Sequence, residues 1–282
     1  MDIGFYPGCS LKGTSSEYAQ STLALAKAFG IKLIEISDWN CCGATATHNL
    51  NHDLSVALPA RVLALAEKNG MKEIVVPCAA CYNRLSVTQH NLNEDKELRK
   101  RISDILQMPL SGDIKILNVM QFVDKYIADR IEEKVIKLFN RKVVCYYGCL
   151  LVRPQGILKF DRLEDPQSMD TLMSKIGADS MEWGYKTECC GAGFSVSRTD
   201  IVGKLSGKII KDAIDREAEV IIVSCPMCQS NLDMRRPHID SYLKIKTNIP
   251  VLFITQAIGL AVGIDREELG LKKLFIVPTF VH

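Results

Sequence analysis

Ten of the eleven cysteines in this 282-residue chain form two sets with the same order and pairing. Each set has a single cysteine, a consecutive pair before a glycine, and a CxxC pair. The first set is Cys9, Cys41, Cys42, Cys78 and Cys81. The second set is Cys149, Cys189, Cys190, Cys225 and Cys228. In a reducing compartment, clustered thiols more often bind metal or do redox chemistry than form structural disulfides.

Five thiolates per set do not match the common metal sites. A structural zinc ion takes four ligands and a cubane iron–sulfur cluster also takes four, so either would leave one cysteine over in each set. Because the consecutive pair recurs, we expect all five cysteines to be used, although two structural zinc sites remain an alternative. The chain has no phosphate loop, no GxGxxG and no HExxH motif. It also lacks a compact ferredoxin run, so cubane clusters that supply electrons are expected in another subunit.

The residues around the cysteines are duplicated as well. EIVVPCAACYNRL (73–85) can be laid over VIIVSCPMCQSNL (220–232), and KILNVMQFV (115–123) resembles VLFITQAIG (251–259). We therefore expect two tandem repeats, 1–138 and 139–282. The charged segment 124–141 between them is predicted to be a solvated helix that leads out of the first repeat.

Short apolar runs alternate with helical patterns in both repeats. The runs predicted as buried strands are 3–6, 32–36, 73–76, 142–146, 179–183 and 219–224. The segments predicted as helices are 16–29, 53–68, 166–176 and 199–216. Gly30 and Gly70 follow two of these helices as expected stops. This alternation predicts an α/β fold, with a mainly parallel sheet and flanking helices in each repeat.

On this interpretation the cysteines lie at the carboxyl ends of strands or at the starts of the following helices. Open α/β sheets build their ligand sites at that edge, so the three cysteine elements of each repeat are expected to converge there. Helix N-termini present backbone N–H groups and a positive dipole end, which stabilise thiolates. Gly8, Gly43, Gly148 and Gly191 adjoin the cysteines, where backbone must approach closely.

The composition gives no support for a nucleic-acid or membrane partner. Apolar residues make up 47% of the chain, and 35 Lys plus Arg nearly balance 33 Asp plus Glu, so nothing favours a nucleic-acid partner or an anionic membrane. The N-terminal residues lack the pattern of a secretory signal, and no apolar run approaches the roughly 20 residues that span a bilayer. The expected location is the cytoplasm, without direct membrane insertion.

The two cysteine patterns and their flanks resemble the CCG-domain family, and within it the B subunit of heterodisulfide reductase, over essentially the whole chain. The resemblance implies that each five-cysteine set holds one non-cubane [4Fe–4S] cluster, so that both repeats bind a cluster. It implies an oxidoreductase in which a disulfide is held between the two clusters and is reduced to two thiols by two one-electron steps. No catalytic residue beyond the clusters is expected.

The resemblance also implies partners, namely a protein like the reductase's C subunit, with cubane [4Fe–4S] clusters, and a flavin-containing protein like its A subunit. An alternative is a non-catalytic electron-transfer subunit of a dehydrogenase complex, because CCG domains also occur beside such partners. The sequence departs from the methanogen members at Gly43-Ala44-Thr45-Ala46, where a proline-bearing segment is more usual. The disulfide substrate therefore stays open, with the coenzyme M–coenzyme B heterodisulfide as one candidate.

Other residues near the cysteines have simpler interpretations. Cys145 is expected inside a strand, as part of the core. His48 and His52 are assigned to a loop or a helix cap rather than to proton delivery, and Lys12 and Arg153 to exposed charge. The remaining large side chains beside the cysteines are expected to shield the clusters or to pack in the core: Trp39, Trp183 and Met227.

Overall fold

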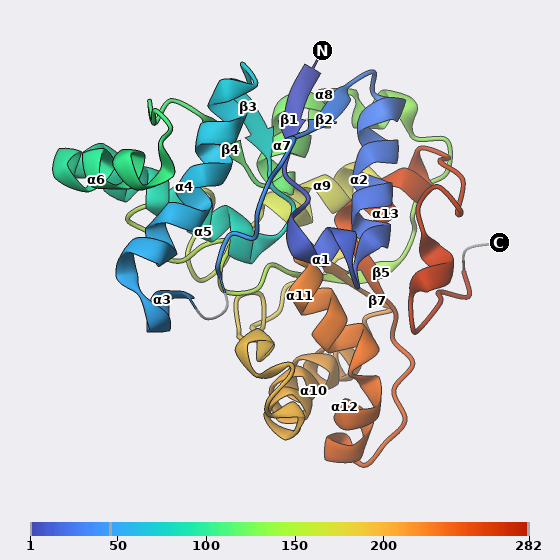
Figure 1. The fold of residues 1–282 in the computed structure, drawn as a ribbon. Helices are drawn as coiled ribbons and strands as arrows, with labels where there is room; N and C mark the ends of the chain where they lie inside the picture. Colours follow the sequence, from blue (N-terminus) through green and yellow to red (C-terminus); the bar gives the residue numbers. More distant parts are fainter. Residues whose placement is uncertain (1, 45–46, 281–282) are drawn as a thin grey trace.

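The computed structural model describes residues 2–44 and 47–280 and contains two four-stranded parallel sheets flanked by helices (Figure 1). The first sheet has the order β2-β1-β3-β4, and its strands are β1 Asp2–Phe5, β2 Lys32–Glu35, β3 Glu73–Val75 and β4 Lys115–Leu117. The second has the equivalent order β6-β5-β7-β8, and its strands are β5 Lys142–Tyr146, β6 Asp179–Ser180, β7 Val220–Val223 and β8 Val251–Phe253. Every pairing is parallel. The predicted α/β fold with a sheet in each half is confirmed.

Helices connect the strands in both halves. Those of the first half are α1 Gly8–Lys12, α2 Ser16–Ala28, α3 Thr47–Leu50, α4 His52–Lys68, α5 Ala79–Glu94, α6 Lys96–Leu106, α7 Val119–Tyr126 and α8 Ala128–Lys134. Those of the second half are α9 Ser168–Lys175, α10 Thr199–Asp215, α11 Pro226–Gln229, α12 Arg236–Leu243 and α13 Ile254–Ala261. The four predicted helices correspond to α2, α4, α9 and α10. Thr45 and Ala46, in the segment that departs from the methanogen members, lie outside the described residues.

Two sequence predictions were wrong in extent. The segment 124–141 is not one helix, because α7 ends at Tyr126, α8 ends at Lys134, and the chain then runs without helix to β5. The break has a physical reason: Ile127 is 1% exposed, so the chain turns toward the core there instead of continuing along the surface. The strand predicted over 179–183 has only two residues, since Trp183 turns inward and donates a hydrogen bond to the Cys145 carbonyl oxygen at 3.0 Å.

The two halves pack against each other through a reciprocal pair of helix contacts. Helix α2 of the first half packs on α13 of the second, and α9 of the second packs on α7 of the first. At the first contact the rings of Tyr18 and Phe253 stack with centroids 3.9 Å apart. The hydroxyl groups of Ser21 and Thr255 are hydrogen-bonded there at 2.7 Å. One continuous core of buried residues therefore runs through both halves.

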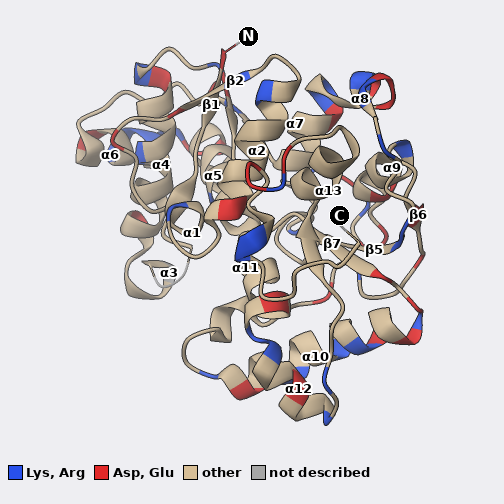
Figure 2. Ribbon diagram, turned by 90° about the vertical axis from the view of Figure 1, so that its right-hand side faces the viewer, with Lys and Arg blue, Asp and Glu red and all other residues tan. Residues whose placement is uncertain are grey.

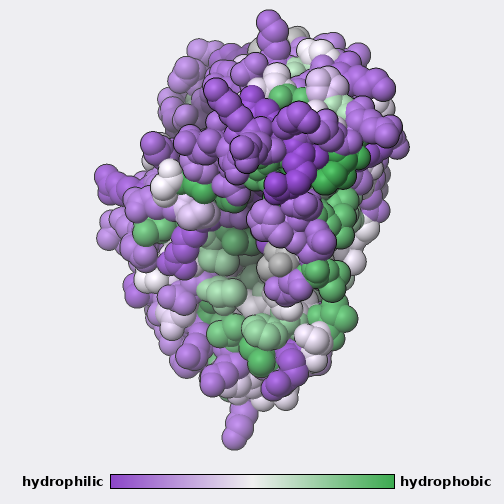
Figure 3. All heavy atoms as spheres, turned by 60° about the vertical axis from the view of Figure 1, so that its left-hand side comes forward, coloured by the Kyte–Doolittle hydropathy of each residue, from purple (hydrophilic) through white to green (hydrophobic). Residues whose placement is uncertain are grey.

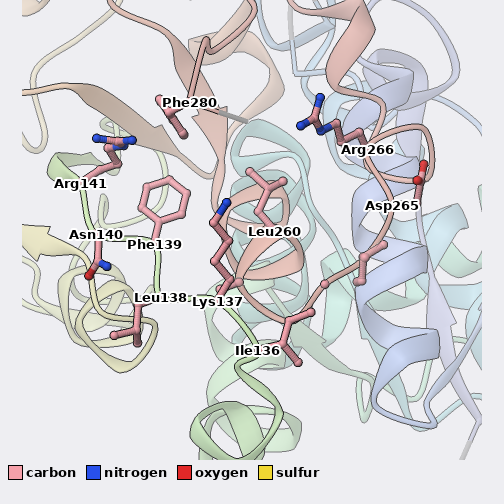
Figure 4. A pocket seen from close by; sticks show the side chains of 13 residues that line it. Ile136, Lys137, Leu138, Phe139, Asn140, Arg141, Leu260, Asp265, Arg266 and Phe280 are labelled. Carbon is pink, nitrogen blue, oxygen red and sulfur yellow. The ribbon is translucent and has the colours of Figure 1, made fainter. Parts of the chain in front are cut away.

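A cavity of about 480 Å³ lies at the amino-terminal edge of the second sheet (Figure 4). Residues 136–141, which lead into β5, form one wall, and the end of α13 with residues 263–266 after it forms part of the other. Phe139 and Phe280 are in edge-to-face contact on its apolar side. Because it adjoins the start of β5, this cavity lies at the edge of the sheet opposite to the cysteines.

Charges of both signs are interspersed on the helices, for example along α8 (Figure 2). Among the described residues, no helix is long and apolar enough to cross a bilayer.

Candidate functional site

The first five cysteines converge at the carboxyl edge of the first sheet. Cys9 lies in α1, directly after β1, and Cys78 and Cys81 lie at the start of α5, after β3. The Sγ atoms of Cys42 and Cys81 are 3.2 Å apart. Cys41 and Cys42 lie close enough to shift each other's pKa, and Cys9 lies close enough to raise the pKa of Cys41. The structure therefore brings together all five residues that the sequence singled out in this half.

The second set repeats this arrangement. Cys149 follows β5, and Cys225 and Cys228 lie at the start of α11, after β7. The Sγ atoms of Cys190 and Cys228 are 3.7 Å apart, and the thiols of Cys149 and Cys189 are hydrogen-bonded to each other. These five residues also form one group at the carboxyl edge of their sheet.

The two sets meet across the boundary between the halves. The Tyr18 hydroxyl, on α2 of the first half, donates to the Ser224 carbonyl oxygen directly before Cys225 at 3.0 Å, and Cys78 and Cys225 lie close enough to shift each other's pKa. Each half also binds the other beside its cysteines: the Ser10 hydroxyl contacts the Met227 sulfur at 3.7 Å, and the Asn83 side chain donates to the Leu150 carbonyl oxygen at 3.2 Å. The cysteine spacing alone did not predict that the sets adjoin, although the resemblance to heterodisulfide reductase implies it.

The group of cysteines is open to solvent on one side. Cys9, Cys41 and Cys189 are exposed, whereas the CxxC cysteines are buried. On the face drawn in Figure 3, a hollow with hydrophobic residues in its walls interrupts a mainly hydrophilic surface. Concave, partly apolar surfaces of this kind are where proteins bind small molecules.

A tyrosine joins two of the cysteine elements in each half. The Tyr6 hydroxyl donates to the Asn40 carbonyl oxygen at 2.8 Å, and the Tyr146 hydroxyl donates to the Glu188 carbonyl oxygen at 2.6 Å. Asn40 and Glu188 occupy the same place, directly before the consecutive cysteines. Burial, followed by the nearby cysteines, raises the pKa of both phenols, so they act as hydrogen-bond donors. The repeated Tyr-x-Gly-Cys motif was the available sequence signal for this role.

Two glycines leave room for the CxxC sulfurs. Gly8 and Gly148 have φ angles of +63° and +71°, which side-chain-bearing residues rarely adopt. A Cβ atom on Gly8 would lie 3.2 Å from the Cys81 Sγ atom, and one on Gly148 would lie 2.9 Å from the Cys228 Sγ atom. Each glycine therefore lets the backbone approach a cysteine of its own set more closely than any other residue would.

Hydrogen bonds to sulfur lower the pKa of some cysteines, whereas the pKa of the thiols that donate them, Cys41 and Cys149 among them, is raised. The Gly43 N–H group donates to the Cys41 sulfur at 3.5 Å, and the Gly191 N–H group donates to the Cys189 sulfur at 3.3 Å. Hydrogen bonds from the Cys41 and Cys81 thiols lower the pKa of Cys42 to about 4. A hydrogen bond from the Cys149 thiol, opposed by burial, lowers the pKa of Cys189 to about 6. Thiolates are the form in which cysteine binds metal.

This donor set fits an iron–sulfur cluster. Each half offers five sulfurs in one group, with backbone N–H donors beside them, as cluster sulfurs require. Within residues 2–44 and 47–280, no three or more His, Cys, Asp or Glu side chains are arranged around a position for a single metal ion.

The charged residues and the histidines near the cysteines have other partners or positions. Lys12 pairs with Glu35 at 2.7 Å, and Arg153 lies 3.5 Å from Glu164, with both basic side chains about half exposed. His52 begins α4 at an exposed position, and the Asn51 side chain caps that helix. The His48 side chain lies outside the described residues.

The aromatic residues and Cys145 pack as the sequence predicted. Trp39 contacts the Tyr6 ring edge-on at 5.6 Å, and Trp183 contacts the Tyr146 ring at 6.3 Å. Cys145 is fully buried within β5, which confirms its prediction as a core residue.

Comparison with known proteins agrees with this geometry. The family model named CCG, described as a cysteine-rich domain, matches residues 3–86 and 143–233. The 8-methylmenaquinol:fumarate reductase membrane anchor subunit of Wolinella succinogenes is 31% identical over 99% of this chain and 98% of its own. The B subunit of the ferredoxin/F420H2-dependent CoB-CoM heterodisulfide reductase of Methanosarcina acetivorans is 25% identical over 96% of this chain and 92% of its own.

The fold also occurs in a solved structure, a hypothetical protein from Helicobacter pylori. The two share 16% sequence identity with a TM-score of 0.82, and the match covers 99% of this chain and 52% of that protein. The chain described here belongs to the CCG family of cysteine-rich proteins. Several of its relatives are named as B subunits of heterodisulfide reductases.

Proposed function

We propose that this chain is the catalytic iron–sulfur subunit of a heterodisulfide reductase-like complex. In this proposal, each five-cysteine set holds one non-cubane [4Fe–4S] cluster, with all ten cysteines as ligands. The observation that carries it is that the two sets adjoin, because Tyr18 donates to the Ser224 carbonyl oxygen directly before Cys225 and Ser10, beside Cys9, contacts the Met227 sulfur. When bound, each cluster would exchange one electron, so two adjacent clusters match a substrate that takes up two electrons. A disulfide is such a substrate.

The residues around the cysteines hold them in position and leave them accessible to a substrate. Tyr6 and Tyr146 hold the first cysteine of each set near the consecutive pair. The exposed Cys9, Cys41 and Cys189 leave the group open on the side from which a substrate would enter. The proposed partners are a protein like the reductase's C subunit, with cubane clusters, and a flavin-containing protein like its A subunit, in a cytoplasmic complex. The relatives support membership of a complex, because they are named as subunits of multi-subunit reductases.

A second candidate function, electron transfer in a quinol-linked complex, is favoured by the similarity to a quinol:fumarate reductase subunit. The relative named as part of a quinol:fumarate reductase is 31% identical, against 25% for the heterodisulfide reductase relative from Methanosarcina acetivorans, and the match covers 98% of its length. In this alternative, the chain passes electrons within a quinol-linked complex and reduces no disulfide.

One experiment separates the two candidates. The chain would be purified anaerobically with its partners, and a series of disulfides would be tested with reduced viologen as electron donor. Thiol formation that is lost in Cys190→Ser supports the disulfide reductase. If no disulfide is reduced while quinol analogues are oxidised through the same complex, the quinol-linked candidate replaces it.

A further inference from the structure

Lys186 is a buried charge three residues before the second consecutive cysteine pair. Its side chain is 2% exposed, and its Nζ atom lies 2.8 Å from Asp165 Oδ1 and 3.5 Å from Asp170 Oδ2. The ammonium group also donates to the Pro166 carbonyl oxygen at 2.9 Å. A lysine is rarely buried unless it is paired, because water stabilises the charged group strongly. The position of this lysine is therefore fixed by three partners.

The backbone of the same residue binds the segment that leads to Cys149. The Lys186 carbonyl oxygen accepts hydrogen bonds from the N–H groups of Tyr147 and Gly148, at 2.9 and 3.0 Å. The Tyr147 hydroxyl donates to Asp170 Oδ2 at 2.7 Å, the same oxygen that lies 3.5 Å from Lys186 Nζ. Tyr147 and Lys186 are therefore linked both through the backbone and through Asp170. This network joins the Cys149 element to the element that carries Cys189 and Cys190.

The first half holds the corresponding segment in another way, because Arg61 of α4 donates to the Asp38 carbonyl oxygen at 2.7 Å and to Asn40 Oδ1 at 3.0 Å. In the repeat alignment, Pro7 stands opposite Tyr147 and Asp38 stands opposite Lys186. The Asp38 side chain is 78% exposed and pairs with Arg61 at 2.5 Å. An exposed ion pair is screened by salt and contributes little to stability. The segment before Cys41 is therefore tied to α4, whereas the segment before Cys189 is tied by two backbone hydrogen bonds directly to the element that leads to Cys149.

We propose that Lys186 is a positioning residue that keeps the second cysteine set assembled before any cluster is present, so that this set takes up iron before the first. The proposal rests on the proposed function only in assigning the ten cysteines as cluster ligands. Lys186 acts through the backbone and through Asp170. Residues that orient metal ligands in this way typically change metal affinity by about tenfold or more when they are replaced.

The test isolates each set by inactivating the other. Cys42→Ser leaves only the second set intact, and Cys190→Ser leaves only the first. Apo protein would be reconstituted anaerobically with ferrous iron and sulfide. Iron bound per chain would be followed in time. We expect faster uptake in Cys42→Ser, and we expect Lys186→Met to lower the iron affinity of that variant about tenfold while leaving Cys190→Ser unchanged.

A matched control is Lys175→Met, which removes a half-buried lysine of the same half that pairs with Glu132 at 3.3 Å. It should leave iron uptake unchanged in both backgrounds. Tyr147→Phe removes only the hydroxyl group that binds Asp170, and it should act in the same direction as Lys186→Met but more weakly. This milder variant tests the proposal even if circular dichroism shows that Lys186→Met does not fold.

A second measurement needs no cluster. In the apo protein with all cysteines present, Lys186→Met should speed the alkylation of Cys149 and Cys189 relative to Cys9 and Cys41, as followed by peptide mass spectrometry. Equal effects on both sets, or no effect on either, would overturn the proposal. An absence of iron uptake by the unsubstituted chain would instead refute the proposed function, and the alkylation rates would still decide the role of Lys186.

Discussion

Gly148→Ala is expected to damage the second cysteine set through one added methyl group. The new Cβ atom would lie 2.9 Å from the Cys228 sulfur, whereas ordinary contacts begin at 3.4 Å, so the sulfur must move by about 0.5 Å. Metal–ligand distances in well-formed sites stay within about 0.2 Å of their usual values. The displacement exceeds this range, so the cluster of the second repeat should be lost.

Two further glycine variants separate this steric effect from backbone strain. Gly8→Ala would place its Cβ atom 3.2 Å from the Cys81 sulfur, which requires a shift of only about 0.2 Å, so the first cluster should largely persist. Gly30 has a similar φ angle of +73°, but a Cβ atom added there would have nothing within 4 Å. Gly30→Ala should therefore cost about 1 kcal/mol of unfolding free energy from strain alone and leave both clusters in place.

The assay is iron content and visible absorption of the anaerobically purified variants, beside urea unfolding of each. We expect about eight irons per chain in the unsubstituted protein and in Gly30→Ala, and about four in Gly148→Ala. Full iron content in Gly148→Ala would refute the steric reasoning. Equal iron loss in Gly30→Ala would assign the effect to backbone strain instead.

Three other substitutions test separate parts of the structure. Cys190→Ser should leave roughly half the iron and abolish disulfide reduction, and a full iron complement would contradict its assignment as a ligand. Cys145→Ser should keep both clusters and cost about 1 kcal/mol in urea unfolding, since its side chain packs in the core; iron loss would count against this. Burial alone would raise the pKa of Glu73, but hydrogen bonds from Lys125 and Tyr126 outweigh it, so that pKa lies below its usual value. These interactions of the Glu73 carboxylate stabilise the folded state at pH values above the unfolded-state pKa of about 4.3. The stabilisation is lost as pH falls through the lower folded-state pKa. Glu73→Gln should therefore cost about 1 kcal/mol at pH 7, with the difference closing in acid, and a difference independent of pH would contradict the ion pairs.

The sequence predicted the convergence of each cysteine set because the strands and the cysteines repeat together. Once Cys9 and Cys78 follow parallel strands, the topology brings them to one edge whatever the loop lengths are. The proximity of Cys78 and Cys225 could not be predicted from the cysteine spacing in the same way. It depends on how the halves pack, for example on Tyr18 of the first half, which stacks on Phe253 and donates a hydrogen bond to the Ser224 carbonyl oxygen at 3.0 Å.

Lys186 shows a second limit of reasoning from sequence. Taken alone, a lysine between Tyr185 and Thr187 in a polar segment indicates an exposed loop. Its burial follows from Asp165 and Asp170, which are about 20 residues away and carry no pattern that links them to it. By contrast, Gln121 and Gln256 could have marked the starts of α7 and α13 in the sequence. Each accepts a hydrogen bond from the backbone N–H group three residues earlier, as capping residues do.

The reciprocal helix contacts give the chain the architecture of a two-fold symmetric dimer whose subunits have been joined end to end. The contact of α2 with α13 pairs the same two elements of the repeat as the contact of α9 with α7. An interface of this isologous kind closes on itself and needs only one type of protomer. Covalent linkage fixes the stoichiometry at one copy of each half. It also lets a residue be substituted in one half without the same substitution in the other, which is impossible in a homodimer. The buried lysine of the second half, replaced by an exposed aspartate in the first, is a difference that only such a linked pair can carry.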